Sequence, residues 1–136
     1  MSIEITEKQV EFVEDMADLI MKKFSKCELM TYTGYKASFL VKDFEKSELG
    51  YVYISVKCTG VICIHLAEYR FYTEEALRVQ KYSKEYGLIL DYIDEEFMGM
   101  WFTNDYSLDE NLKLIKKYIM LFSAIIEVGH KIELFK

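Results

Sequence analysis

The sequence predicts an α+β domain in which an antiparallel sheet of about five to six strands packs with an N-terminal helix, a mid-chain helix and a long C-terminal helix. Three observations support this prediction. Apolar residues recur at three- and four-residue steps near both ends of the chain. Between residues 27 and 70, β-branched and aromatic residues alternate with polar ones. The 136 residues contain no proline and no linker, so a single domain is expected over residues 1–136.

The N-terminal helix is expected to run from about Glu7 to about Ser25. Thr6 and Gln9 have the spacing of a capping box, in which each side chain bonds the backbone N–H of the other residue. The stripe expected to face the core contains Val13, Met16, Ala17, Ile20 and Phe24. The opposite side carries an acidic row that is expected to be solvated, formed by Glu7, Glu11, Glu14 and Asp18.

The middle of the chain is expected to form strands joined by short turns. One strand candidate covers residues 35–42, and two more cover residues 51–58 and 61–67. Thr59 and Gly60 separate the last two and suit a two-residue hairpin turn, since glycine tolerates a positive φ. The cross-strand pairs expected from this turn are Val56 with Cys63 and Ile54 with His65.

The second half of the sequence predicts a helix from Thr73 to Tyr86, with Gly87 as its left-handed C-terminal cap. The residues expected to point inward from this helix are Ala76, Leu77 and Val79. Two strands should follow at residues 88–93 and 96–103, joined at Asp94 and Glu95. The last helix, of about 20 residues, is expected between the capping-box pair Ser107 and Glu110 and a terminal Gly129.

The last helix carries two adjacent apolar stripes. The first contains Leu108, Leu112, Ile115, Ile119, Phe122 and Ile126. The second contains Leu114, Tyr118, Leu121, Ile125 and Val128. A helix on one face of a sheet needs only one stripe, so the second should be buried within the domain or against another copy. The second stripe is therefore the candidate surface for self-association, and a homodimer is expected.

The composition bounds the partners. A net charge of −6 argues against direct nucleic-acid binding, because that affinity depends on Lys and Arg neutralising phosphates. No apolar run reaches the roughly 18 to 20 residues of a membrane span, and the N-terminal residues lack a secretion signal, so a cytoplasmic protein without a membrane partner is expected. The three cysteines are expected to be reduced.

Residue types and spacing predict no catalytic residues, no metal site and no cofactor. His65 is expected to be a core histidine, and His130 lies where a positive charge complements the dipole of the last helix. Cys58, Cys63 and His65 supply three possible zinc ligands, but the sequence shows no fourth. Each of the six glycines stands alone, which argues against a phosphate-binding loop.

The segment from Asp91 to Glu110 combines seven acidic residues with aromatic and methionine side chains and contains no basic residue. A structural explanation exists, since Asp109 and Glu110 favour a helix N-terminus and a turn accepts acids. Apolar anchors rimmed by acids would also select a partly basic, partly apolar protein segment. The candidate partner-binding residues are Asp91, Asp94, Glu95, Glu96, Phe97, Met100, Trp101 and Asp105.

Three stretches support a family resemblance: Glu75-Ala76-Leu77 opens a helix, residues 97–102 form a strand, and residues 107–112 open the last helix. With the order of elements, they resemble the type III secretion chaperone-like fold, which includes the YbjN-type bacterial proteins. The resemblance implies a homodimer that holds an extended segment of a client protein, or a regulatory relative, without catalysis. The asparagine pair often seen in the second helix of YbjN-like proteins is absent, with Gln80 and Ser83 in that region.

Three functions are consistent with these observations. The leading hypothesis is a non-enzymatic protein-binding module, chaperone-like or regulatory and dimeric. The alternative is a small acidic inhibitor, such as an immunity protein or a phage-encoded antagonist of a nuclease, whose acids mimic phosphates. The third is a small-ligand binder with a pocket around Met98 to Phe102.

Overall fold

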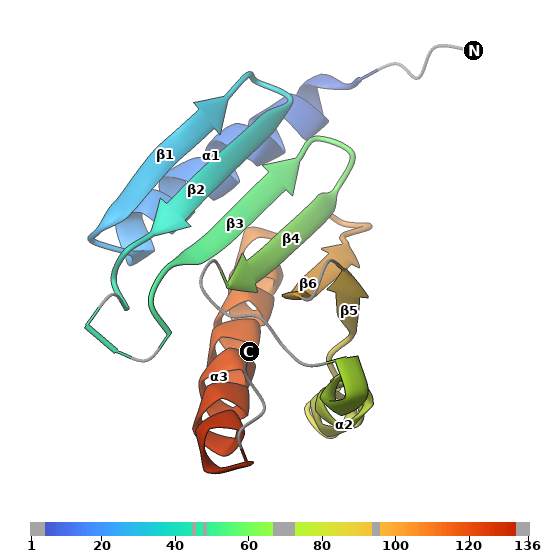
Figure 1. The fold of residues 1–136 in the computed structure, drawn as a ribbon. Coiled ribbons are helices and arrows are strands. Elements are labelled where there is room, and N and C mark those ends of the chain that lie inside the picture. The colour runs from blue at the N-terminus through green and yellow to red at the C-terminus, as the bar shows by residue number, and fades with distance from the viewer. Residues whose placement is uncertain (1–4, 45, 48, 67–72, 94–95, 133–136) are drawn as a thin grey trace.

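The computed structural model shows the expected α+β fold, with three helices and a six-stranded antiparallel sheet among the residues it describes (Figure 1). Those residues are 5–44, 46, 47, 49–66, 73–93 and 96–132, and their side chains are described except at 73–75, 93 and 128–132. The elements are α1 (Glu7–Lys23), β1 (Cys27–Tyr32), β2 (Lys36–Val41), β3 (Val52–Lys57), β4 (Val61–Leu66), α2 (Thr73–Lys84), β5 (Leu90–Ile93), β6 (Glu96–Phe102) and α3 (Leu108–Ile132).

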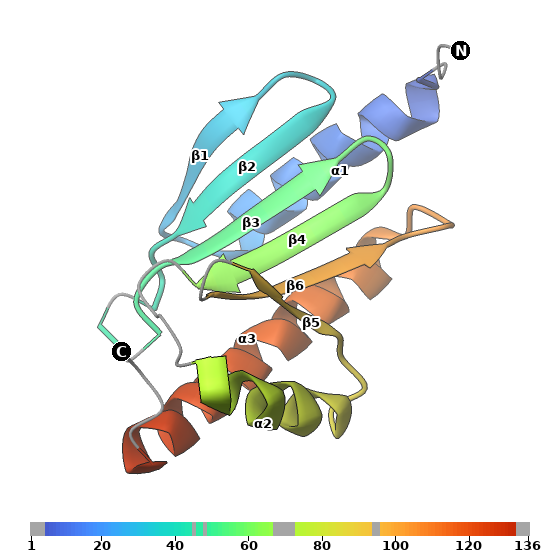
Figure 2. The ribbon, with the colours of Figure 1, turned by 45° about the vertical axis from the view of Figure 1, so that its right-hand side comes forward.

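The sheet has the strand order β1-β2-β3-β4-β6-β5, and each neighbouring pair is antiparallel. Helix α1 packs on β1, β2 and β3, α3 packs on β4 and on α1, and α2 lies against β5. Figures 1 and 2 show α1 and α3 on the same side of the sheet. Among the described residues no helix covers the other side. We call that side the open face and the helix-bearing side the covered face.

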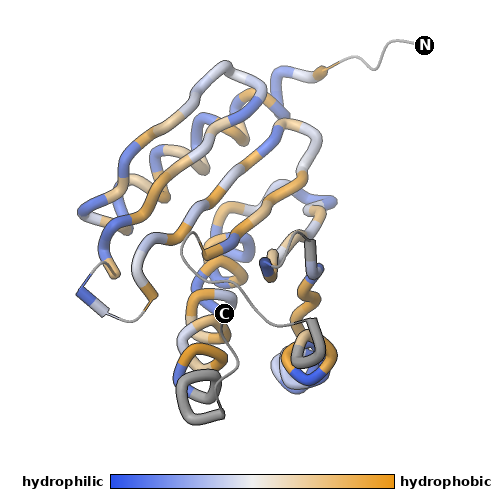
Figure 3. Tube along the Cα trace, viewed as in Figure 1, coloured by the Kyte–Doolittle hydropathy of each residue, from blue (hydrophilic) through white to orange (hydrophobic). Residues whose placement is uncertain are grey.

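The core lies between the covered face and the helices. Buried and less buried residues alternate along β3 and β4, so one set of side chains points into this layer. Figure 3 shows a matching alternation of hydrophobic and hydrophilic residues in β3, whereas β4 is mostly hydrophobic. The inward residues are 3% exposed or less: Ala37, Phe39, Val41, Val52, Ile54, Val56, Ile62, Ile64 and Leu66. Helix α1 adds the expected apolar stripe, all of it buried, and begins with the expected capping box of Thr6 and Gln9.

The β3–β4 hairpin differs from the expected register by one residue. Val56 pairs with Ile62 and Tyr53 with His65, because the loop contains three residues instead of two. Gly60 closes this loop with φ +94° and donates its N–H to the Lys57 carbonyl at 2.9 Å, the geometry of a turn followed by a left-handed residue. The expectation that His65 is a core histidine was wrong, since His65 lies on the open face.

Two further expectations about the helices were wrong. Leu77 is 75% exposed on α2, whereas Ala76 and Val79 are buried as expected. Helix α3 continues through Gly129 to Ile132, so this glycine does not end it. Gly87 does have the expected left-handed φ of +68° just after α2.

Most of the described side chains in the two apolar stripes of α3 are buried within one chain. In the first stripe Leu112, Ile115, Ile119, Phe122 and Ile126 are buried and Leu108 is half-buried. In the second, Tyr118, Leu121 and Ile125 are at most 2% exposed, Leu114 is half-buried, and the side chain of Val128 lies outside the described residues. Of the two ways to bury the second stripe, the structure therefore shows burial within the domain for these three residues.

Candidate functional site

The residues expected to bind a partner are divided between the two faces of the sheet. Phe97 is buried in the core, and Trp101 points toward α3. The Trp101 ring stacks on Tyr118 with centroids 5.2 Å apart and planes 5° apart. Its Nε1 donates a hydrogen bond to Asn111 Oδ1 at 2.8 Å. Phe97 and Trp101 therefore contribute to packing on the covered face, and neither lies on the open face.

Asp105 organises the start of α3. Its carboxylate accepts hydrogen bonds from the Ser107 N–H and from the Thr103 hydroxyl, at 3.0 and 3.1 Å. These two bonds lower the pKa of Asp105, the Ser107 bond more strongly. Ser107 then accepts from the Glu110 N–H, which is half of the expected capping box. This local role gives Asp105 a structural explanation.

The open face receives Asp91 and Met100 from the same candidate set. Asp91 pairs with Met98 across β5 and β6, and Met100 pairs with Cys63 across β6 and β4. Glu96 is half-buried at the start of β6, opposite residue 93. Asp94 and Glu95 lie outside the described residues. The set therefore does not form one surface.

The outward side chains of the open face form three rows, since directly opposite residues of an antiparallel pair point to the same side. The first row contains Leu40, Tyr53, His65, Met98 and Asp91. The second contains Ser38, Ser55, Cys63 and Met100. The third contains Lys36 and Lys57, followed across the hairpin loop by Val61 and Phe102.

One half of the open face, over β4 and β6, is apolar. Phe102 is 58% exposed and Met100 is 44% exposed. Val61, Cys63 and Met98 lie beside them and are half-buried. Single exposed apolar residues are ordinary, but neighbouring ones on adjacent strands indicate a contact surface.

The other half, over β2 and β3, is polar and hollowed. A shallow groove of about 270 Å³ lies between the strands there. The Tyr53 and His65 rings stack at its margin, with centroids 5.1 Å apart and planes 21° apart. Serines are short, so the directly opposed Ser38 and Ser55 leave space between longer neighbours. The outward side chains that line the groove are Met30, Lys36, Ser38, Tyr53, Ser55 and His65.

Cys63 lies between the two halves of the open face, and charged groups on both sides of it affect the pKa of its thiol. Burial raises the pKa of the Cys63 thiol, and the charge of Asp91 adds to the increase. The ammonium groups of Lys57 and Lys36 act in the opposite direction. Cys63 and His65 are two residues apart on one strand, whereas Cys58 is buried in the hairpin loop. Within the described part of the chain, no group of three or more His, Cys, Asp or Glu residues gathers as metal ligands would.

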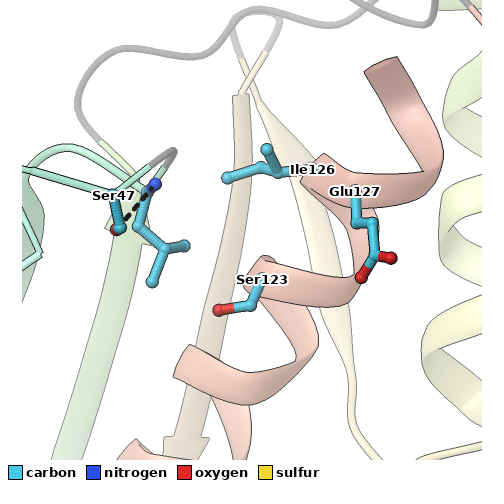
Figure 4. A pocket seen from close by; sticks show the side chains of 5 residues that line it. Ser47, Ser123, Ile126 and Glu127 are labelled. Atoms are coloured by element: carbon cyan, nitrogen blue, oxygen red, sulfur yellow. Dashed lines mark hydrogen bonds between the residues drawn. The ribbon is translucent and has the colours of Figure 1, made fainter. Parts of the chain in front are cut away.

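Two other hollows lie away from the open face. One, of about 250 Å³, separates α3 from the loop between β2 and β3; Figure 4 shows Ser123, Ile126 and Glu127 on the helix side and Ser47 opposite. The second, of about 210 Å³, lies between α2 and the segment that enters β5 and is lined by residues including Gln80 and Leu88. Neither is built from the residues around Met98 to Phe102 in which a ligand pocket was expected.

Comparisons with known proteins give no relative. No protein-family model matches the chain, and neither a curated protein nor a solved structure matches it. The resemblance to the type III secretion chaperone-like fold therefore stays a prediction that rests on element order. No helix among the described residues is both long and apolar enough to cross a bilayer.

Sequence reasoning missed the open face because it concentrated on the acidic segment. The sequence of β6 contained the signal. Met98, Met100 and Phe102 are apolar on one side of the strand, and Phe97 and Trp101 are apolar on the other. A strand that is apolar on both sides predicts contacts on both sides. The wrong register predicted for the β3–β4 hairpin also placed His65 on the wrong side of the sheet, because a shift of one residue exchanges the faces of opposing residues.

Proposed function

We propose that this chain is a non-enzymatic protein-binding module, chaperone-like or regulatory, that holds a segment of its partner on the open face of the sheet. The observation that carries the proposal is the apolar half of that face. Met100 and Phe102 are exposed there, although the same strand buries Phe97 on its other side. Burial of such side chains against a partner would contribute roughly 25 cal/mol for each Å² of apolar area removed from water.

The contrast with the covered face supports this function. Each described buried side-chain nitrogen or oxygen has a hydrogen-bond partner, and the core residues are closely packed, so the fold is stabilised without the open face. Exposed Phe and Met side chains add nothing to that core. Apolar residues beside polar groups that fix orientation are typical of surfaces that bind extended segments.

The test removes the apolar side chains from the open face without changing the fold. In the variant Met100→Ser/Phe102→Ser, the amount of partner protein recovered from the native host by affinity purification should fall strongly. Quantitative mass spectrometry of isotope-labelled samples measures this amount. The control Leu77→Ser/Met120→Ser removes two side chains that are exposed on α2 and α3, and it should retain the partners. Thermal unfolding should show that each substitution changes stability by less than about 1 kcal/mol. Equal recovery with both variants would contradict the proposal.

A homodimer is part of the proposal, through a surface other than the second stripe of α3. The edge strand β1 fits a second copy, because Leu29, Met30 and Tyr32 are 39–52% exposed and one backbone edge of the strand has no neighbour among the described strands. Light scattering should give twice the chain mass, and Met30→Lys should return the protein to a monomer. A monomer for the unmodified chain at high micromolar concentration would exclude the dimer.

One observation favours the acidic inhibitor as a second candidate. The four carboxylates expected along α1, at Glu7, Glu11, Glu14 and Asp18, are all exposed. A row of this kind could cover a basic channel by mimicking phosphates, and such binding weakens strongly as salt is raised. Partner recovery that is lost at high salt and in Glu11→Gln/Glu14→Gln, but kept in Met100→Ser/Phe102→Ser, would favour this candidate.

A further inference from the structure

Two lysines oppose each other on the open face although the chain is acidic. Lys36 and Lys57 are direct cross-strand partners of β2 and β3, and both are exposed. Like charges at directly opposite positions destabilise a sheet. Among the described residues neither lysine makes an ion pair, in contrast to Lys42, which pairs with Glu28 at 2.9 Å on the same face. The fold gains nothing from this pair of charges, whereas an anion placed between them would offset their repulsion.

The groove beside the two lysines supplies hydrogen-bond donors. Ser38 and Ser55 face each other next to Lys36 and Lys57, and Tyr53 follows on the same side. No hydrogen bond joins these three hydroxyls to another described residue, so each can donate to a ligand. Two ammonium groups with adjacent hydroxyls are the donor set that a carboxylate accepts.

The lysine charges act across the face as well as at its margin. Lys57 and Lys36 both lower the pKa of Cys63, two strands away from Lys36, against the larger effect of burial. The charge of Asp91 raises the same pKa, so the two ammonium groups are the positive contribution on this face of a chain whose net charge is −6. Two adjacent ammonium groups attract an acidic group and disfavour a basic one.

We propose that the groove binds a carboxylate from an acidic residue in the extended partner segment, and that apolar residues two and four positions later rest on Val61 and Phe102. This inference rests on the proposed function, because it names the chemistry of the segment that the open face holds. It also reverses the basic partner expected from the acidic segment around Asp91.

The spacing of the strands sets the spacing in the segment. A carboxylate between Lys36 and Lys57 is about 7 Å from Val61 and about 12 Å from Phe102, counting strand separations of roughly 4.8 Å. An extended chain places side chains on one side every two residues, or about 6.7 Å. An acid followed by apolar residues at the second and fourth positions therefore fits a segment that crosses the strands.

The experiment measures binding of three labelled peptides by fluorescence anisotropy. Each peptide has Leu at the second and fourth positions after a variable residue, which is Glu, Gln or Lys, within a Gly/Ser background. The Glu peptide should bind about tenfold more tightly than the Gln peptide, and the Lys peptide should bind most weakly. The Glu advantage should disappear in Lys36→Gln/Lys57→Gln and should shrink as salt rises.

The matched control is Lys116→Gln/Lys117→Gln, which removes the same charge from exposed positions of α3 and should keep the Glu advantage. Phe102→Ser should weaken the Glu and Gln peptides equally. Thermal unfolding checks that every variant is folded.

Three results would overturn the inference. Equal binding of the Glu and Gln peptides, both weakened by Phe102→Ser, would leave the proposed function intact and remove only the acidic group. Competition by acetate or phosphate at the same concentration as the peptide would show a site for small anions instead of a segment. Failure of all three peptides to bind would exclude this segment, and partner recovery with Met100→Ser/Phe102→Ser would then decide the proposed function separately.

Discussion

The two faces of the sheet are made by the same strands and meet different demands. On the covered face, Phe39, Ile54 and Ile64 are at most 1% exposed and pack against α1 and α3. On the open face, their neighbours Ser38, Ser55 and Cys63 are half-buried, and no helix in the described part of the chain packs on them. The covered face carries the free energy of folding, since apolar burial is its main source. The side chains of the open face contribute less to this burial.

Polar groups show the same difference. On the covered face, the Tyr118 hydroxyl donates to the Ile89 carbonyl at 2.6 Å and accepts from the Ile89 N–H at 3.1 Å, which joins α3 to the start of β5. On the open face, the hydroxyls of Ser38 and Ser55 have no partner among the described residues. Buried polar groups must be paired to avoid a desolvation cost, whereas hydroxyls open to water need no protein partner. The open-face hydroxyls can therefore serve a ligand.

The largest expected effect compares two neighbours on β6. A Cβ at Gly99 would overlap the ring of Tyr118, which cannot move aside because it is buried, stacked on Trp101 and hydrogen-bonded. Gly99→Ala should therefore lower the free energy of unfolding by about 1–3 kcal/mol. Met100→Ala, one residue later on the open face, should change it by less than about 1 kcal/mol. Chemical denaturation measures both, and a smaller loss for Gly99→Ala would break the distinction between the faces.

A second prediction compares a buried amide with a half-buried hydroxyl of the open face. Asn111→Ala leaves the Trp101 Nε1–H without its acceptor and should cost about 1–3 kcal/mol. Ser55→Ala removes a hydroxyl without a described partner and should stay within about 0.5 kcal/mol of the unmodified protein. Equal losses would show that the open-face hydroxyl contributes to the fold, contrary to its proposed role.

The smallest effect concerns two half-buried thiols, Cys27 and Cys63. Burial and the charge of Asp43 raise the pKa of Cys27 from 9.0 to about 11, whereas Lys57 and Lys36 limit the increase at Cys63. Thiolate is the reactive form, so iodoacetamide at about pH 8 should label Cys63 faster than Cys27. Mass spectrometry reads both sites. The variant Lys36→Gln/Lys57→Gln should slow the labelling of Cys63 and leave that of Cys27 unchanged. Equal labelling rates of Cys63 in this variant and in the unmodified protein would contradict the effect of the two lysines on its pKa.

The same Cys27 shift gives a pH dependence. Its pKa is higher in the folded state, so its contribution to stability is complete below the ordinary value of 9.0 and is lost as pH rises through about 11. The free energy of unfolding should therefore fall over this range, and Cys27→Ser should flatten the decline.

Local signals predicted much of the fold correctly. The capping box of Thr6 and Gln9 joins residues three positions apart, and successive residues of the apolar stripe of α1 are three or four positions apart or adjacent. Both patterns can be read directly from the sequence. The left-handed cap at Gly87 is also local. The hairpin register was wrong because two- and three-residue loops both accept glycine at their end, and the choice depends on how β4 pairs with β3 and β6.

The candidate site was less predictable from the sequence than the fold. Acidity and aromatic content drew attention to residues 91–110, yet Phe97 is a core residue, Trp101 packs against the core, and Asp105 accepts a hydrogen bond at the start of α3. Spacing alone could not separate these roles. Lys36 and Lys57 are 21 positions apart, so their juxtaposition is visible only once β2 and β3 are paired.

The sequence by itself determined where helices and strands form, because periodicity, caps and turn residues act over a few positions. Only the tertiary structure decided which side of each strand is covered. In β6 both sides are apolar, and pairing with β4 places Trp101 against Tyr118 while Met100 and Phe102 point away from the helices. Long-range pairing and helix packing fix that choice, and with it the face that we propose for partner binding.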